Sequence, residues 1–195
     1  MKRIAQPIIF LLSLLIFTSV YGLAYSADQE STRIRIGLKL FRAIIAADTQ
    51  IQSKRATDGK LAFAIIYKNN AQKATLYTEM LQNLGKGDKR GRIKGIPIRV
   101  DSISVDQLGQ LSTINYAGLY FVEEIENLPL QTLINYAIKQ QIISYSPFEG
   151  DVEKGVSAGL SVGARVKPYV NVSTLKRSGL QLKPFFLKVS KSYAP

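Results

Sequence analysis

The side chains of this chain that could do chemistry are carboxylates, lysines, arginines, serines and amides, because the sequence contains no histidine and no cysteine. The two absences exclude zinc sites of the usual His/Cys kind, Ser-His-Asp triads and Cys-His dyads. A Ser-Lys or carboxylate-only mechanism remains as an alternative, and it would need side chains that the fold brings together. We therefore expect a protein that is not an enzyme, with no catalytic residues, no metal site and no cofactor.

Carboxylates gather in two short clusters, at Glu123, Glu124 and Glu126 and at Glu149, Asp151 and Glu153. Both clusters fall where strand ends or loops are expected. A solvated acidic rim is therefore favoured over a catalytic or calcium site.

A basic block surrounds the glycine-rich segment 85–95 and consists of Lys86, Lys89, Arg90, Arg92, Lys94 and Arg99. Such a block could hold phosphate or an acidic partner, but its glycines match no Walker spacing, and a solvated loop is the alternative. We take Arg90, Arg92 and Lys94 as the expected partner-binding residues. Binding through them should weaken sharply with salt.

Hydrophobic periodicity predicts the elements that position these residues. In chain order, we expect a helix at 31–47, a strand at 61–67, a helix at 71–84, a strand at 96–103, a short helix or turn at 105–111, a strand at 116–122, a helix at 130–138 and a strand at 141–145. This alternation predicts an α/β fold, with a mostly parallel sheet of about four strands and helices on both faces.

After Pro147 the pattern changes to short alternating runs. Residues 156–162 and 166–172 predict a β-hairpin at the margin of the sheet. The strand of Pro168 should lie at an edge or have its proline nitrogen turned outward, because proline donates no ladder hydrogen bond. A helix ending at Gly179 and a terminal helix starting at Pro184 are expected to follow. We see no internal repeat or linker, which predicts a single domain over residues 27–195.

A small-ligand pocket is expected at the carboxyl ends of the parallel strands. Asn69 follows the first strand, and Ser146, Phe148 and Glu149 follow the fourth. Asn69 and Ser146 would supply hydrogen bonds, while Phe148 would supply an apolar wall. Ordinary loop packing is the alternative.

The first 26 residues resemble a cleaved signal peptide. Lys2 and Arg3 precede an apolar run from Ile8 to Val20, and small residues stand at Ala24 and Ser26. An uncleaved membrane anchor is the alternative. We expect export to the periplasm, where anionic lipid surfaces and acidic proteins, rather than nucleic acid, are the expected partners of a chain whose formal net charge is +12.

The carboxyl-terminal third contains four short elements in a fixed order: Ser146-Pro147-Phe148-Glu149-Gly150, Gly155 to Gly159, Tyr169-Val170-Asn171-Val172, and Ser178-Gly179-Leu180 leading into Pro184 to Val189. In the order and spacing of these elements, the chain resembles the YfiR family of periplasmic proteins. The entry to the second strand at Lys94 to Ile98 and the strand from Tyr116 to Val122 are similar as well. The resemblance extends from about Leu61 to the end of the chain.

The resemblance implies an α/β domain that acts by binding a membrane-bound signalling protein, of the diguanylate cyclase or sensor kinase type, and that can form a homodimer. The cysteines and the tryptophan of the family are missing here. We therefore expect a periplasmic regulatory or sensor protein without a redox switch. The alternative is a periplasmic binding protein for a small anionic ligand.

Overall fold

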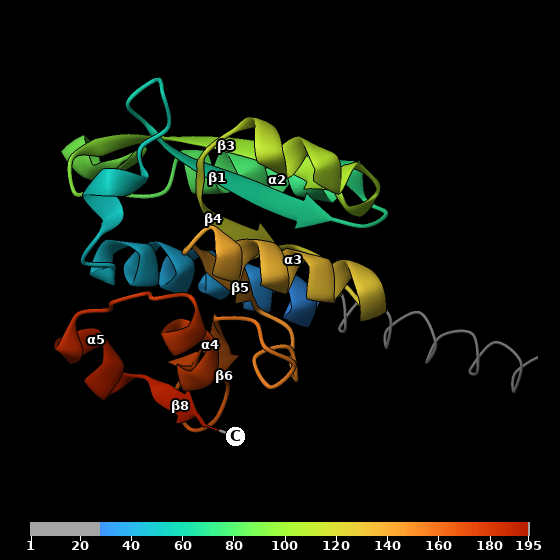
Figure 1. The fold of residues 1–195 in the computed structure, drawn as a ribbon, viewed down its shortest axis with the longest axis vertical. Helices are drawn as coiled ribbons and strands as arrows, with labels where there is room; N and C mark the ends of the chain where they lie inside the picture. The colour runs from blue at the N-terminus through green and yellow to red at the C-terminus, as the bar shows by residue number, and fades with distance from the viewer. Residues whose placement is uncertain (1–27, 195) are drawn as a thin grey trace, which may run out of the picture. The chain divides into compact units, whose positions relative to one another are not determined.

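A computed structural model describes residues 28–194, without the side chain of Asn127. The chain divides into two units, residues 1–36 and residues 37–195. In the first unit, the described residues 28–36 are helical; in the second, residues 37–47 are helical and precede the sheet (Figure 1). The predicted signal peptide, residues 1–26, lies outside the described residues.

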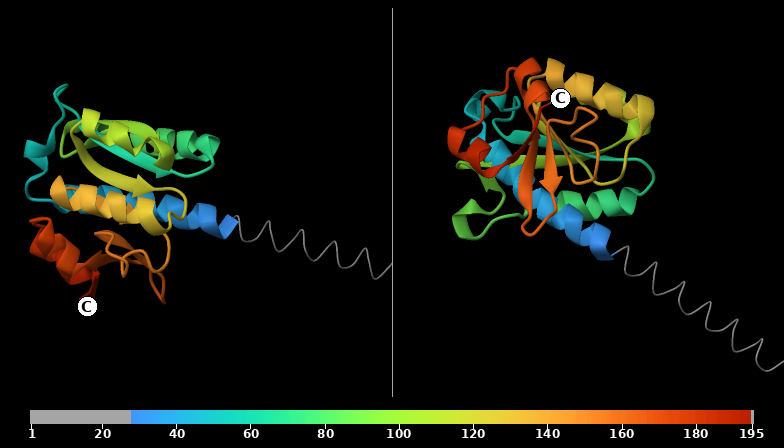
Figure 2. Two further views of the ribbon diagram at one scale, coloured as in Figure 1. Left: turned by 45° about the vertical axis from the view of Figure 1, so that its right-hand side comes forward. Right: turned by 90° about the horizontal axis from the view of Figure 1, so that it is seen from below.

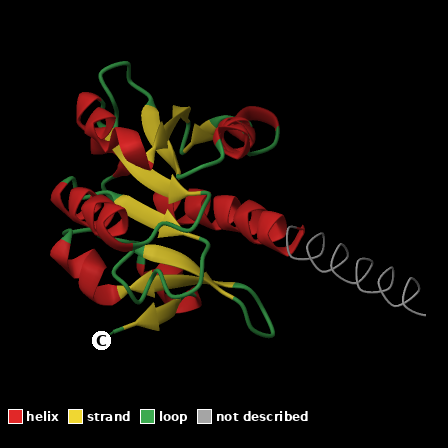
Figure 3. Cartoon of the chain, turned by 90° about the vertical axis from the view of Figure 1, so that its right-hand side faces the viewer, coloured by secondary structure: helices red, strands yellow, loops and turns green. Residues whose placement is uncertain are grey.

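The second unit is built on one eight-stranded sheet, in which the strands stand in the order β2-β3-β1-β4-β5-β6-β7-β8 (Figure 3). The strands are β1 (Leu61–Tyr67), β2 (Arg92–Ile93), β3 (Ile96–Ser104), β4 (Tyr116–Phe121), β5 (Ile143–Ser146), β6 (Ala158–Ser161), β7 (Lys167–Asn171) and β8 (Lys191–Tyr193). Neighbouring strands run parallel except for β2 with β3 and β6 with β7.

The helical segments of this unit connect the strands. They are η1 (Ile51–Lys54), α2 (Ala71–Gln82), η2 (Gly87–Lys89), η3 (Val105–Thr113), α3 (Asn127–Lys139), α4 (Val172–Arg177) and α5 (Pro184–Val189). The right-hand view of Figure 2 shows α2, in green, and α3, in yellow, on opposite sides of the strands. The prediction of helices on both faces of a mostly parallel sheet is therefore confirmed. Among the described residues, no helix has the length and apolarity needed to cross a bilayer.

Aromatic rings fill one face of the sheet beneath the helix at residues 37–47. Phe41 contacts Phe63, Tyr120 and Tyr145 edge to face, with ring centroids 5.4, 5.5 and 5.8 Å away. Gly118 lets the helix approach, because a Cβ at this position would lie 3.0 Å from the Phe41 ring. This face is a close-packed aromatic core.

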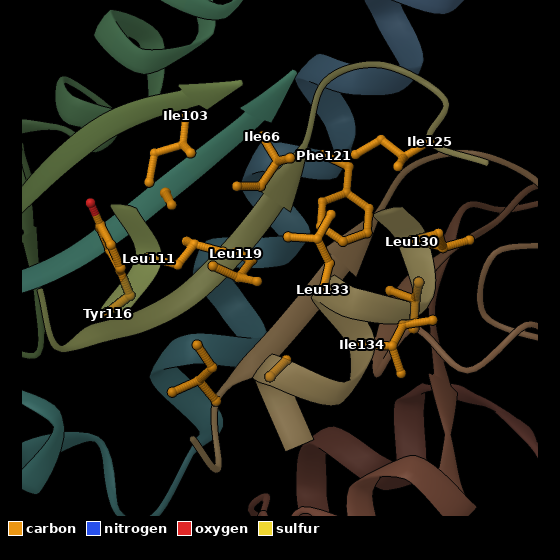
Figure 4. Close-up of a cluster of buried hydrophobic side chains, with 14 of the residues drawn as sticks. Ile66, Ile103, Leu111, Tyr116, Leu119, Phe121, Ile125, Leu130, Leu133 and Ile134 are labelled. Carbon is orange, nitrogen blue, oxygen red and sulfur yellow. The ribbon is translucent and has the colours of Figure 1, made fainter. Parts of the chain in front are cut away.

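Mostly aliphatic side chains fill the opposite face, where α3 packs (Figure 4). Ile66 and Phe121 from neighbouring strands meet Leu130, Leu133 and Ile134 of the helix, and each of these side chains is almost fully buried. Alternate residues of β1 and β4 thus serve two cores, which explains why both strands are apolar throughout.

The expected count of about four parallel strands is wrong, since the sheet has eight strands. The predicted hairpin is present as β6 and β7, and β6 also pairs in parallel with β5. Two further strands, β2 and β8, have two and three residues and are too short for hydrophobic alternation to reveal. Pro168 pairs with Leu160 on one side, and the ladder to β8 begins one residue later, at Tyr169.

Candidate functional site

The connections of the sheet change direction between β1 and β4. From β1 the chain passes through α2 to β3 on one side, and from β4 it passes through α3 to β5 on the other. β1 and β4 are parallel neighbours, so their carboxyl ends lie side by side. In open α/β sheets a ligand binds at such a switch point, because the two connections diverge and leave a crevice between them.

The loop after β1 places three backbone N–H groups around one atom of the loop after β4. Lys68, Asn69 and Asn70 donate to Oε2 of Glu123 over 2.7, 2.9 and 3.2 Å. The side chain of Asn70 caps α2 by accepting the N–H of Lys73 over 2.8 Å. We call the three N–H groups the amide cradle.

The amide cradle holds Glu123 in its charged form. Partial burial by itself would raise the pKa of this carboxyl group, but the hydrogen bonds from Asn69, Asn70 and Lys68, with the nearby charge of Lys73, outweigh burial and lower the pKa. Three N–H groups converging on one oxygen form an anion-binding concavity. In this structure the carboxylate of the chain itself fills it.

Ser146 and Phe148 lie at the end of β5, which is separated from β1 by β4. The Ser146 hydroxyl is fully buried, donates to Oδ2 of Asp151 over 2.6 Å and accepts the N–H of Phe148 over 3.1 Å. Phe148 is buried, whereas Glu149 is exposed. The structure thus uses Ser146 and Phe148 to pack the loop 147–157, as the loop-packing alternative described, and the ligand role assigned to them stays a prediction.

The partner of Asn69 is Glu123, which the sequence placed at the end of a strand on the same edge of the sheet and assigned to a solvated acidic rim. Glu123 lies more than fifty residues from the loop it joins, and its neighbours Glu124 and Glu126 look the same in the sequence. Asp151 was likewise assigned to a rim, although it is 3% exposed and bonded to Ser146 and Lys154. The one sequence signal for Glu123 and Asp151 is that both are polar residues in loops that follow strands.

A second surface lies at the β2 edge of the sheet, in the segment 85–95 with its basic side chains, which we call the basic loop. Lys94 and Gly95 form a two-residue turn between β2 and β3, with φ values of 49° and 81°, as tight hairpins require. Arg90 donates to Oδ1 of Asn83, and Arg92 donates to the Gly95 carbonyl. The three predicted partner-binding residues therefore belong to one ordered, exposed segment.

Arg42, from the helix at residues 37–47, anchors this segment. Its guanidinium donates to the carbonyls of Leu84 and Lys89 over 2.6 Å each, and also to the carbonyl of Arg92. The planar group with its five donors suits three carbonyls at once. The shape of the basic loop is therefore set from outside the loop.

Comparisons with known proteins identify solved structures with a similar fold. No family model and no curated protein matches the chain. Among solved structures, the ABC domain from Streptococcus pneumonia in complex with L-tryptophan matches at a TM-score of 0.54 and 11% identity, over 80% of this chain and 60% of that one. A substrate-binding protein with adhesive properties from Clostridium difficile, in its ligand-free, open form, matches at 0.50 and 14%, over 80% and 58%.

The fold of this chain is therefore an α/β fold similar to that of substrate-binding proteins. The chain spans about 60% of the length of the structures it matches. The resemblance to the YfiR family stays a prediction. In residues 28–194, no three His, Cys, Asp or Glu residues are grouped as a metal site would require.

Proposed function

We propose that the protein binds a small ligand at the carboxyl ends of β1 and β4, with the amide cradle as the centre of the site. The observation that carries the proposal is the convergence of the N–H groups of Lys68, Asn69 and Asn70 at the switch point of the sheet. The similarity to substrate-binding folds supports it. Fold similarity alone assigns no ligand, so the site provides the argument.

The chemistry of the cradle favours a ligand with a carboxylate or phosphate group. The three N–H groups already donate together to one anionic oxygen, that of Glu123, and the cradle lies at the amino-terminal end of α2, where the helix dipole favours negative charge. An anionic ligand must displace Glu123 from the cradle. Glu123 therefore lowers the apparent affinity by competing for the same donors.

Substitution of Glu123 tests the proposal. Purified protein is screened by thermal shift against small carboxylates, amino acids and phosphate esters, because a ligand bound to the folded state raises its apparent stability. In Glu123→Ala the cradle is open, and we expect an anionic hit to bind about tenfold more tightly, as loss of a competing charged hydrogen-bond acceptor implies. Glu124→Ala, an exposed neighbour, should leave the affinity unchanged.

The direction of the effect decides the ligand class. Weaker binding in Glu123→Ala would show that Glu123 itself contacts a cationic ligand, and would contradict the anionic assignment. Failure of every ligand to shift the melting temperature of either protein would contradict the proposed site.

The regulatory role expected from the sequence stays a separate prediction, and its test does not involve the cradle. Reversal of Arg90, Arg92 and Lys94 to Glu should abolish capture of a membrane signalling protein from solubilised membranes, while the fold persists because all three side chains lie in the exposed loop. Unchanged capture would remove the basic loop from such an interface.

A further inference from the structure

Apolar side chains are exposed mainly in the carboxyl-terminal part of the chain. Of seven large apolar side chains exposed in the described residues, five lie between positions 162 and 189, namely Val162, Val166, Phe185, Leu187 and Val189. Phe185 is 78% exposed and Val162 is 61% exposed. Single exposed apolar residues are common on proteins, but a group of them marks an interaction surface.

These residues come from two adjacent segments. Val162 and Val166 belong to the turn between β6 and β7, and Phe185 and Val189 lie four residues apart on α5, hence on one side of that helix. A shallow cavity of about 450 Å³ is lined by the turn and by Lys191 at the start of β8. The turn and the residues Ser190 and Lys191, which directly follow α5, therefore flank one cavity, and we call the two segments the docking face (residues 162–167 and 185–191).

Basic side chains stand in the same two segments as the apolar ones. Arg165 and Lys167 stand in and beside the turn, Lys188 lies on α5, and Lys191 begins β8 with its Nζ 4.7 Å from the centre of the Tyr169 ring. From Lys154 to Pro195 the sequence has eight basic residues and no acidic residue. The docking face thus combines exposed apolar side chains with basic ones, and the cavity between its two segments is lined by Arg165, Lys167 and Lys191. One carboxylate lies beside it, because Glu153 accepts the Tyr169 hydroxyl over 3.0 Å.

We infer that the docking face binds the surface of an anionic lipid bilayer. Aromatic and aliphatic side chains flanked by lysine and arginine are the combination that enters the headgroup region, where the cations contact lipid phosphate. The long stems of Lys188 and Arg165 can follow the apolar side chains while their charges reach the phosphates. A second copy of the chain fits poorly, because a two-fold contact through this face would set its cations against each other.

Tryptophan fluorescence tests the contact directly, since the chain contains no tryptophan. Full-length Val162→Trp and Phe185→Trp proteins are titrated with vesicles of equimolar phosphatidylcholine and phosphatidylglycerol. We expect a blue shift of the emission and quenching by brominated lipid for both. Leu128→Trp is the matched control, because Leu128 is 79% exposed on α3, and its spectrum should not move.

Charge substitutions test the lipid specificity. The double variant Lys167→Gln/Lys188→Gln should bind anionic vesicles with a partition coefficient about 25-fold lower than that of the parent protein, as measured by vesicle sedimentation. Each cation removed should lower the partition coefficient about fivefold. The control pair Lys86→Gln/Lys89→Gln, in the basic loop, should change it little. Residues 1–26 are common to all these proteins, so their contribution cancels in the comparison.

Three results would overturn the inference. One is the absence of a blue shift at positions 162 and 185 with anionic vesicles, which would leave an acidic protein as the partner of this face. Another is an equal shift in the Leu128→Trp protein. A third is an equal loss of binding in the two lysine pairs, because it would show that net charge alone, and not the docking face, attracts the protein.

Discussion

The Ser146 hydroxyl donates a 2.6 Å hydrogen bond to Oδ2 of Asp151, and both residues are buried at the base of the loop that joins β5 to β6. The same carboxylate accepts Lys154 through its other oxygen over 3.1 Å. A short loop between parallel strands is thereby held in place by polar contacts instead of by a crossover helix.

Replacement of Ser146 by Ala should lower the free energy of unfolding by about 1–3 kcal/mol. The change leaves the Phe148 N–H and one oxygen of Asp151 without their buried partner, and unsatisfied buried groups cost this much. Urea denaturation measures the loss. Glu149→Ala, an exposed change in the same loop, should stay within about 0.5 kcal/mol of the parent, and equal effects would contradict the role of Ser146.

Replacement of Gly159 by Ala should lower the free energy of unfolding by about 1–3 kcal/mol. A Cβ at this position would lie 2.5 Å from the Ser146 carbonyl oxygen and 2.8 Å from the Val152 side chain, so the backbone must shift. Gly163→Ala is the matched control, because a Cβ there has open space around it. Thermal unfolding should distinguish the two variants, and similar melting temperatures would show that β6 accommodates the added methyl group.

Replacement of Arg42 by Ala should loosen the basic loop while the sheet remains folded. The loss of three donated hydrogen bonds frees the carbonyls of Leu84, Lys89 and Arg92, of which the last two are exposed and can be solvated. Hydrogen exchange followed by mass spectrometry should show faster exchange in residues 85–93 and unchanged exchange in β1. Lys39→Ala, exposed on the same helix, is the control, and equal protection of the loop in both variants would contradict the anchoring role.

At pH values above the pKa of Glu123 in the unfolded state, the charged carboxylate should stabilise the fold. In acid, this stabilisation should be lost. In the folded state the pKa of this group is lowered from its ordinary value of 4.5. Its contribution to the free energy of unfolding is therefore complete above pH 4.5 and is lost as the pH falls through the lower pKa of the folded state. Because the group is only partly buried, solvent screening should limit the contribution to below about 1 kcal/mol.

Comparison with Glu123→Gln isolates this contribution, because glutamine keeps an accepting oxygen but carries no charge. The difference in unfolding free energy between the two proteins, measured by urea titration from pH 3 to pH 7, should be constant above about pH 5.5 and should shrink below it. A difference that grows toward acid would show that the cradle does not favour the charged form.

Local patterning predicted the main elements well. The strand at 61–67 and the helix starting at Ala71 were placed correctly, because hydrophobic periodicity is a property of neighbouring residues. The hairpin after Pro147 was also visible in its alternation. β2 and β8 were missed, since strands of two and three residues exist only by pairing with β3 and β7.

The candidate site was predicted only in its location. The expectation of polar groups at the strand ends indicated Asn69, yet the sequence offered no means of choosing Glu123 over Glu124 as the residue that meets it. The Ser146 hydroxyl, which we expected to supply a hydrogen bond to a ligand, is bonded within its own loop, and its ligand role stays a prediction. Such contacts depend on which way a loop turns after its strand, and residue spacing does not specify that direction.

The sequence by itself determined the absence of His and Cys chemistry, the alternation of strands with helices and the concentration of positive charge after Lys154, because composition and short-range periodicity need no partner. The tertiary structure alone decided that Glu123 fills the amide cradle, that Arg42 anchors the basic loop, and that the turn after β6 lies beside Ser190 and Lys191. Each of these contacts joins residues more than twenty positions apart, and only the pairing order of the sheet brings them together.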